Sequence, residues 1–228
     1  MATWNASKPA LTNTIAADIP DIEENFLELH DVITAITNGT LGTTTAANFR
    51  VDAITQVKTF FVPAEDMRGT ATNGAATSNI ELATNDIEVV VYVFDATTEE
   101  FVCFSRPMPE DWNVGTIRAK FFWYSASGSS PDDTVEWKLA CVAVSDDDPL
   151  DAAPGTPQVI SDAITEDGDL QITAKTPAIT IGGTPASGDL VHFKISRNVG
   201  GTDDMAQDAR LLGVWIQYTA DVKAAAWA

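Results

Sequence analysis

Residues 116–144 read TIRAKFFWYSASGSSPDDTVEWKLACVAV, and this stretch decides the fold class. Two runs of alternating side chains, TIRAKFFWY and TVEWKLACVAV, flank a loop rich in Ser, Gly, Pro and Asp. From Ile117 onward every second residue is apolar, and Arg118 begins the set that faces the opposite way. A period of two is typical of a β-strand. The stretch therefore predicts two long strands, and we expect them to form a hairpin with an aromatic-rich inner face.

Shorter runs of the same kind continue on both sides of this stretch, bounded by Gly, Pro, Asn and Asp. They cover residues 57–62, 87–94, 100–105, 159–164, 170–174, 179–181, 190–197 and 210–219. The run 87–94, IEVVVYVF, is apolar almost throughout, so we expect it to be covered on both faces, with 100–105 as its hairpin partner. Eight to ten short strands without an internal helix predict an all-β fold, a jelly-roll-like β-sandwich over residues 41–228.

Residues 18–37 are the one segment that predicts an α-helix. Its apolar side chains recur at alternating spacings of three and four, as in a coiled-coil seam. They are Ile19, Ile22, Phe26, Leu29, Ile33 and Ile36. Isoleucine at both seam positions favours trimers or tetramers. The alternative is an amphipathic helix lying on its own domain, and the seam is too short to hold a trimer alone. We expect residues 1–40 to be an anchoring arm with an oligomerisation helix.

Two tryptophans lie near the ends of the sequence. Trp4 stands in a polar, turn-prone segment, and Trp227 is one residue from the last. A large aromatic side chain in a loose segment is typical of docking on a partner. We therefore predict that both contact a sister subunit or another protein of the assembly. The alternative for the segment that carries Trp4 is a disordered tail.

The charge of the chain restricts its partners. Asp and Glu number 33 against 13 Lys and Arg, a formal net charge of −20. Phosphate backbones and anionic membrane surfaces would be repelled, so we expect no nucleic-acid partner. No apolar run is long enough for membrane insertion, and the pattern of a signal peptide is absent from the opening residues. Cys103 and Cys141 are expected to be free thiols, with a disulfide as the alternative.

The sequence offers little chemistry. It contains no GxSxG, HExxH, CxxC or phosphate-cradling motif, and His30 and His192 are both expected at the surface. The acidic groups at 146–148 and 166–169 lack the spacing of a calcium loop and are interpreted as solvated loops, so no metal or cofactor is predicted. We expect no enzyme, although a carboxylate pair for glycoside hydrolysis stays open. Five aromatic residues could line a glycan-binding groove: Trp112, Phe122, Tyr124, Trp137 and Trp215. Trp112 is the candidate glycan contact, with burial of such aromatics in the core or in an interface as the alternative.

Five segments carry a resemblance to a known class of proteins. Residues 3–33, TWNASKPALTNTIAADIPDIEENFLELHDVI, resemble the N-terminal segments of phage tail and fibre proteins. The remainder resembles small phage virion proteins at FDATTEEFVCFSRPMPEDWNVGTIRAKFFW (94–123), VEWKLACVAVSDDDPLD (135–151), GDLVHFKISRN (188–198) and DDMAQDARLLGVWIQYT (203–219). The resemblance implies a trimeric jelly-roll protein of a tailed-phage virion, made in the host cytoplasm, and it carries over no catalytic residue.

These observations together predict a structural role. The main hypothesis is a homotrimeric virion protein on the particle surface, a capsid decoration or head fibre, that acts by assembly with other capsid or tail proteins. The alternative is a tail fibre or spike that binds host-surface carbohydrate.

Overall fold

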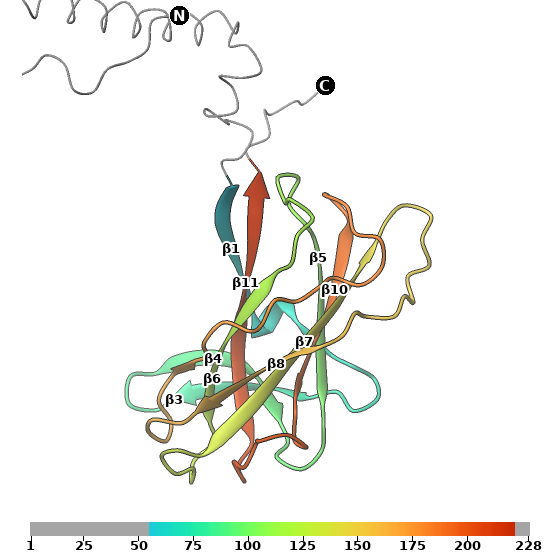
Figure 1. Ribbon diagram of the computed structural model, residues 1–228. Helices are drawn as coiled ribbons and strands as arrows, with labels where there is room; N and C mark the ends of the chain where they lie inside the picture. The colour runs from blue at the N-terminus through green and yellow to red at the C-terminus, as the bar shows by residue number, and fades with distance from the viewer. Residues whose placement is uncertain (1–54, 222–228) are drawn as a thin grey trace, which may run out of the picture. The chain divides into compact units, whose positions relative to one another are not determined.

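Residues 55–221 form a sandwich of two antiparallel β-sheets in the computed structural model, which describes these residues (Figure 1). The predicted helix and arm, with Trp4 and Trp227, lie outside the described residues. The strands are β1 (Thr55–Pro63), β2 (Arg68–Gly69), β3 (Ala76–Leu82), β4 (Ile87–Phe94), β5 (Phe101–Pro107), β6 (Arg118–Ser125), β7 (Thr134–Val144), β8 (Gln158–Ala163), β9 (Gln171–Ile172), β10 (Leu190–Arg197) and β11 (Ala209–Asp221). A 3₁₀ turn, η2 (Ala64–Asp66), is the one helical element among the described residues. No helix in this part of the chain has the length and apolarity needed to cross a membrane.

The strand order is that of a jelly roll. The six-stranded sheet has the order β3-β4-β11-β6-β9, with β1 also paired to β11, and the five-stranded sheet has the order β2-β5-β10-β7-β8. From β4 onward, successive strands alternate between the sheets except for β7 and β8, which pair with each other, and β4-β11-β6-β9 faces β5-β10-β7-β8. This is the two-sheet, eight-strand arrangement of jelly rolls. The predicted fold class of the β domain is confirmed.

Two predicted hairpins are wrong. β6 pairs with β11 and β9, whereas β7 pairs with β10 and β8, so these neighbours in sequence lie in opposite sheets. The same holds for β4 and β5. The reason lies in the connections, because neither has the two-residue turn that enforces a hairpin. The eight residues 126–133 are long enough to cross the roughly 10 Å between packed sheets.

The predicted inward faces of β6 and β7 do meet, across the sandwich instead of along one sheet. The fully buried Trp137 stacks on Phe121 with ring centroids 5.5 Å apart, and it makes edge contacts with Phe94 at 5.1 Å and Trp123 at 6.1 Å. Edge and offset contacts at such distances are the favoured geometries of aromatic pairs. This cluster joins the two sheets.

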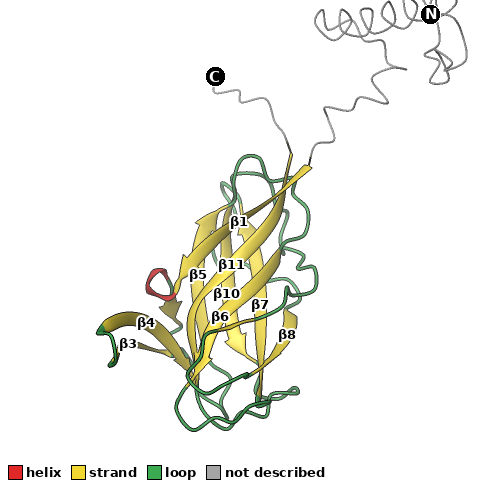
Figure 2. Ribbon diagram, turned by 90° about the vertical axis from the view of Figure 1, so that its left-hand side faces the viewer, coloured by secondary structure: helices red, strands yellow, loops and turns green. Residues whose placement is uncertain are grey.

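The β3–β4 hairpin extends beyond the sandwich (Figure 2). Strand β11 pairs only with residues 92–94 of β4, and β1 pairs with β11 from Gly213 onward. The first half of β4 is therefore open to solvent, and Ile87 is 52% exposed. The expectation that 87–94 is covered on both faces is wrong for this half.

A buried ion pair holds the loop that follows β10. The side chains of Arg197 and Asp203 are buried, and the guanidinium donates to both carboxylate oxygens at 2.7 and 2.8 Å. Its third nitrogen donates to the Gln207 carbonyl at 2.7 Å. Every strong group of the pair thus has a partner, which is the condition for burying charge at acceptable cost.

The two ends of the described chain lie side by side. Thr55 is the register partner of Asp221, and the β1–β11 ladder runs from this pair to Pro63 and Gly213. Both ends therefore leave the sandwich at the same end, as Figures 1 and 2 show. Cys103 and Cys141 are free thiols, as predicted.

Candidate binding surface on the six-stranded sheet

The exposed large hydrophobic side chains of the described region gather on one face. Nine are exposed, and seven of them belong to the six-stranded sheet or its immediate flank. These seven are Val57, Phe61, Leu82, Ile87, Leu170, Ile172 and Trp215. Exposed apolar side chains that gather on one side of a domain indicate an interaction surface.

The strand register shows that Phe61, Ile172 and Trp215 lie on the same outer face as Lys120 and Phe122. Phe61 and Lys120 both lie opposite Trp215, and Phe122 lies opposite Ile172. Residues directly opposite in an antiparallel pair project from the same face. We call the outward row along β6 and β11, with Phe61 beside it, the outer strip. It consists of Phe61, Arg118, Lys120, Phe122, Tyr124, Leu212, Trp215 and Gln217.

Three aromatic rings form the middle of the outer strip. The Phe122 ring makes edge contacts with Phe61 at 5.3 Å and with Trp215 at 5.2 Å between centroids. Trp215 stays 42% exposed and Phe61 40%. A β-bulge between Leu211 and Gly213 re-aims the strand here. A Cβ atom on Gly213 would lie 2.4 Å from Cζ of Phe61, so glycine is what allows that ring its place over β11.

A small cationic hollow adjoins Trp215 on one side. Its volume is about 150 Å³, and its lining residues are Thr59, Arg118, Ala119, Lys120, Lys175, Trp215 and Gln217. Three of these are cations and none is a carboxylate. The Arg118 guanidinium donates to the Thr176 carbonyl at 2.8 Å, which orients it while leaving its other N–H groups for a ligand.

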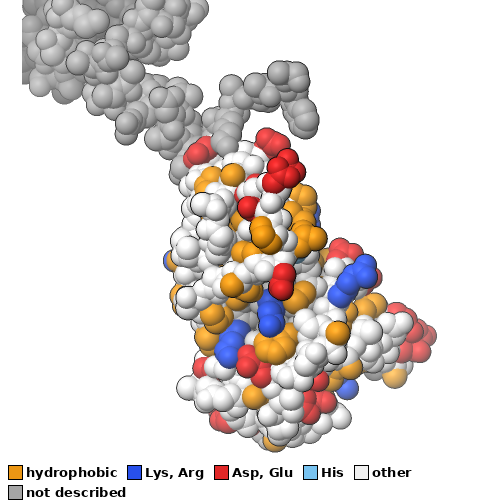
Figure 3. All heavy atoms as spheres, turned by 90° about the vertical axis from the view of Figure 1, so that its right-hand side faces the viewer, with side chains coloured by type: hydrophobic (Ala, Val, Ile, Leu, Met, Phe, Trp, Pro, Cys, Tyr) orange, Lys and Arg blue, Asp and Glu red, His pale blue; other side chains and the backbone are white. Residues whose placement is uncertain are grey.

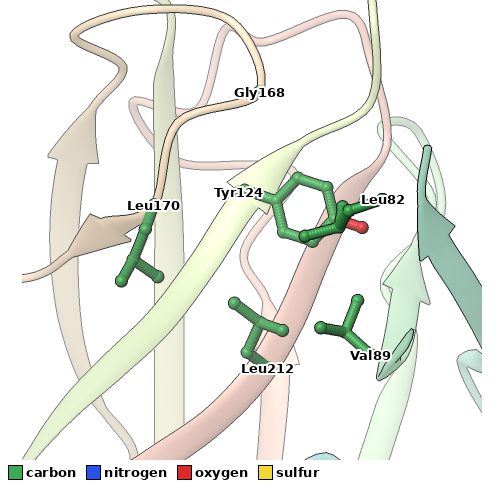
Figure 4. A pocket seen from close by; sticks show the side chains of 6 residues that line it. All are labelled: Leu82, Val89, Tyr124, Gly168, Leu170 and Leu212. Atoms are coloured by element: carbon green, nitrogen blue, oxygen red, sulfur yellow. The ribbon is translucent and has the colours of Figure 1, made fainter. Parts of the chain in front are cut away.

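An apolar pocket lies at the other end of the outer strip (Figure 4). It measures about 180 Å³ and is lined by Leu82, Val89, Tyr124, Gly168, Leu170 and Leu212. The side chains of Tyr124, Leu212 and Val89 converge on it from β6, β11 and β4. The Tyr124 hydroxyl is buried and has no hydrogen-bond partner among the described residues. From Arg118 to Tyr124, the strip spans about 20 Å along β6.

The outer face of the five-stranded sheet holds a different cleft, of about 320 Å³. Cys103, Ser105, Val142, Leu150, Ala152, Pro154, His192, Phe193 and Lys194 line it. Figure 3 shows this side of the molecule, where hydrophobic, basic and acidic side chains are interspersed. Ser105 Oγ lies 2.6 Å from His192 Nδ1, which places His192 on the outer face, as predicted.

That serine–histidine contact lacks the rest of a nucleophilic site. A general-base histidine needs a third group that orients its ring, and no carboxylate within residues 55–221 is hydrogen-bonded to His192. Burial raises the pKa of the neighbouring Cys103 thiol, against a smaller lowering by Lys194, and burial raises the pKa of Cys141 to about 12. Neither thiol is in its nucleophilic, ionised form at neutral pH.

The structure does not support Trp112 as a glycan contact. Its side chain is 0% exposed, because the 107–115 corner folds over the end of the sandwich and Trp112 bridges to Ala220 of β11. Ser187 also donates to its carbonyl at 2.9 Å. Within residues 55–221 the exposed tryptophan is Trp215, one of the five aromatics expected as possible groove residues. Its place between the buried Val214 and Ile216 in the alternation of β11 is the sequence feature that distinguishes it from Trp112.

The acidic loops act as local hydrogen-bond acceptors. Asp167 accepts from the Gly128 amide at 2.8 Å and from Ser125 Oγ at 2.7 Å, and these bonds lower its pKa. Asp148 accepts from the Ser145 amide at 3.1 Å. Within residues 55–221, no group of three or more His, Cys, Asp or Glu is arranged to hold a metal ion.

No protein-family model and no curated protein matches the sequence. Among solved structures, the xylohexaose complex of the CBM22-1–GH10 modules of Clostridium thermocellum xylanase 10B is 13% identical with a TM-score of 0.40, over 72% of this chain and 28% of that one. The CBM22-2 xylan-binding domain of Paenibacillus barcinonensis Xyn10C is 11% identical with a TM-score of 0.40, over 70% and 98%. A mannan-recognising module, TmCBM27, is 7% identical with a TM-score of 0.38, over 73% and 99%. Likenesses this weak carry no argument for this chain.

Proposed function

We propose that this chain is a non-catalytic carbohydrate-binding domain that holds a glycan along the outer strip. The observation that carries the proposal is the solvent-exposed Trp215, which lies between the Phe122 ring and the polar hollow of Thr59, Lys120 and Gln217. A sugar ring presents an apolar C–H face and a rim of hydroxyls. An aromatic face suits the first and side-chain donors and acceptors suit the second.

The shape of the outer strip favours a chain of sugars over a single one. The strip is an open row about 20 Å long, with the cationic hollow at one end and the apolar pocket at the other. A monosaccharide would contact only one part of it. An extended oligosaccharide would use the Trp215 platform and the polar groups together, and each added contact would lower its dissociation rate.

The virion resemblance supports a setting for this activity. On a tail fibre or spike, the ligand would be a carbohydrate of the host surface. The single exit end of the domain, at Thr55 and Asp221, suits a module that is tethered at one end and exposes its side.

The test is binding of the full chain to immobilised oligosaccharides, compared with two variants. Trp215→Ala is expected to abolish binding, because it removes the platform. Leu150→Ala is the matched control, because Leu150 is 73% exposed in a loop of the opposite face. Retention of full binding by Trp215→Ala, or no glycan bound by the unaltered chain, would refute the proposal.

A second candidate function, a homotrimeric capsid decoration or head fibre, rests on a different observation. Of the nine exposed large hydrophobic side chains within residues 55–221, seven lie on or beside the six-stranded sheet, which is the distribution expected of a subunit contact. Sedimentation of the pure protein would then show a trimer that Trp215→Asp dissociates, and removal of residues 1–40 would prevent incorporation into particles. If the protein sediments as a monomer and loses glycan binding on Trp215→Ala, the carbohydrate-binding function is supported and the trimeric one is refuted.

A further inference from the structure

We infer that the glycan bound by the outer strip is acidic, with carboxylate or sulfate groups that meet Arg118, Lys120 and Lys175. This inference rests on the proposed function and names its ligand class. Its starting point is the composition of the hollow beside Trp215, where three cations and no carboxylate form the lining. The full chain has 33 Asp and Glu against 13 Lys and Arg, so such a cluster runs against the composition.

Within residues 55–221, three other cations form ion pairs and the three cations of the hollow do not. Ion pairs in the described region join Lys58 to Asp111, Lys138 to Glu99 and Arg197 to Asp203. No ion pair within residues 55–221 includes a cation of the hollow. Neighbouring cations without an anion between them repel one another. A bound anion would supply the missing charge.

The position of the cations fits a sugar acid better than a free anion. Lys120 lies directly opposite Trp215 in the sheet, and Arg118 lies opposite Gln217. An acidic sugar whose ring packs on Trp215 would therefore place its charged substituent among the cations. Arg118, held by Thr176, keeps N–H donors that suit the two oxygens of a carboxylate or sulfate.

The net charge of the chain gives the binding a characteristic salt dependence. At 0.15 M salt the Debye length is about 8 Å, so a ligand on the strip feels the adjacent cations and little of the distant acids. Raising the salt to 1 M screens the local attraction as well, and affinity for an acidic glycan is expected to fall about tenfold or more. Affinity for a neutral glycan would stay constant.

The test uses the full chain and three hexasaccharide probes in isothermal titration calorimetry. The probes are oligogalacturonate, its fully methyl-esterified form and a sulfated heparin hexasaccharide. Oligogalacturonate should bind at least about tenfold more tightly than its neutral ester, and the sulfated probe distinguishes sulfate from carboxylate recognition. Lys120→Gln and Lys175→Gln are each expected to weaken acidic binding about fivefold. Lys194→Gln, on the opposite face, is the matched charge control and should bind as the unaltered chain does.

The outcomes separate this inference from the proposed function. If Trp215→Ala abolishes binding but esterification, salt and the lysine variants change nothing, the ligand is neutral and the inference is wrong while the proposed function stands. If no probe binds and a panel of other glycans also fails, both are wrong. Loss of binding in Lys194→Gln alone would place the ligand in the cleft of the five-stranded sheet and overturn the inference. Equal binding of single-stranded DNA of the same charge would show a general anion site and overturn it too.

Discussion

The two outer faces of the sandwich have similar alternation of side chains, but they differ in whether their cations have partners within the domain. On the five-stranded sheet, Lys138 pairs with Glu99 at 2.9 Å and Lys194 lies 3.8 Å from the Phe101 ring centroid. On the six-stranded sheet, the cations of the hollow belong to no ion pair within residues 55–221, and Trp215 is exposed to solvent. Satisfied charges stabilise the fold, whereas unsatisfied ones beside exposed aromatics are free for a ligand. The contrast predicts which changes should alter stability and which should alter binding.

The largest expected effect on stability comes from removing one partner of a buried ion pair. Arg197→Met leaves the buried Asp203 carboxylate without its partner and should lower the free energy of unfolding by about 3–5 kcal/mol, as measured by urea denaturation. Arg68→Met, at an exposed cation of β2, is the control and should change stability by less than about 0.5 kcal/mol. A loss below about 1 kcal/mol for Arg197→Met would show that the pair is not what holds the 198–208 loop.

An intermediate effect is expected where the backbone supports the outer strip. Gly213→Ala places a Cβ atom 2.7 Å from the Val62 carbonyl and within 2.4 Å of the Phe61 ring, so β1 must shift away from β11. The expected loss of unfolding free energy is about 1–3 kcal/mol. Gly200→Ala, where nothing lies within 4 Å, is the matched control. Unchanged stability in Gly213→Ala would mean that the Phe61 ring moves freely on the strip.

A smaller change, a gain in stability, is expected from substituting Asp162, whose carboxylate accepts a hydrogen bond from Trp123 Nε1 at 2.9 Å. Burial raises the pKa of Asp162, and the Trp123 bond opposes this only in part. A carboxyl whose pKa is higher folded than unfolded stabilises the fold at low pH, and this contribution is lost as pH rises through the folded pKa. Asp162→Asn keeps an acceptor for Trp123 and should raise stability at pH 7 by less than about 1 kcal/mol. Thermal melts at pH 7 and pH 3 check this, since the gain should vanish at pH 3.

The smallest effect on stability is expected from substituting Lys120 and Lys175, the lysines of the hollow. Lys120→Gln and Lys175→Gln should leave the free energy of unfolding within about 0.5 kcal/mol of the unaltered chain. Thermal melts of both variants, measured beside their glycan binding, sharpen the contrast between the faces. A stability loss above 1 kcal/mol would show that these lysines serve the fold after all.

The sequence predicted the strands and their inward faces more fully than it predicted the site. Alternation places Phe121 and Trp137 inward, and both are fully buried. Pairing partners could not be derived, because β6 joins β11 across about ninety residues and no local rule selects that partner. The outer strip depends on that pairing, so its combination of Lys120, Trp215 and Phe61 appears only in three dimensions. Trp112 shows the converse, since it was the candidate glycan contact and the folded 107–115 corner buries its ring.

The neighbouring ends of the domain have a mechanical consequence. A pull applied between residues 55 and 221 alone would open the β1–β11 ladder from its end, one hydrogen bond after another. A load carried from a glycan on Trp215 to a tether at residue 55 is different, because it draws β11 lengthwise against β1. The whole register from Thr55 to Pro63 then resists together, in shear. The β1–β11 ladder is thus expected to resist a force applied through the ligand more strongly than a force that pulls residues 55 and 221 apart.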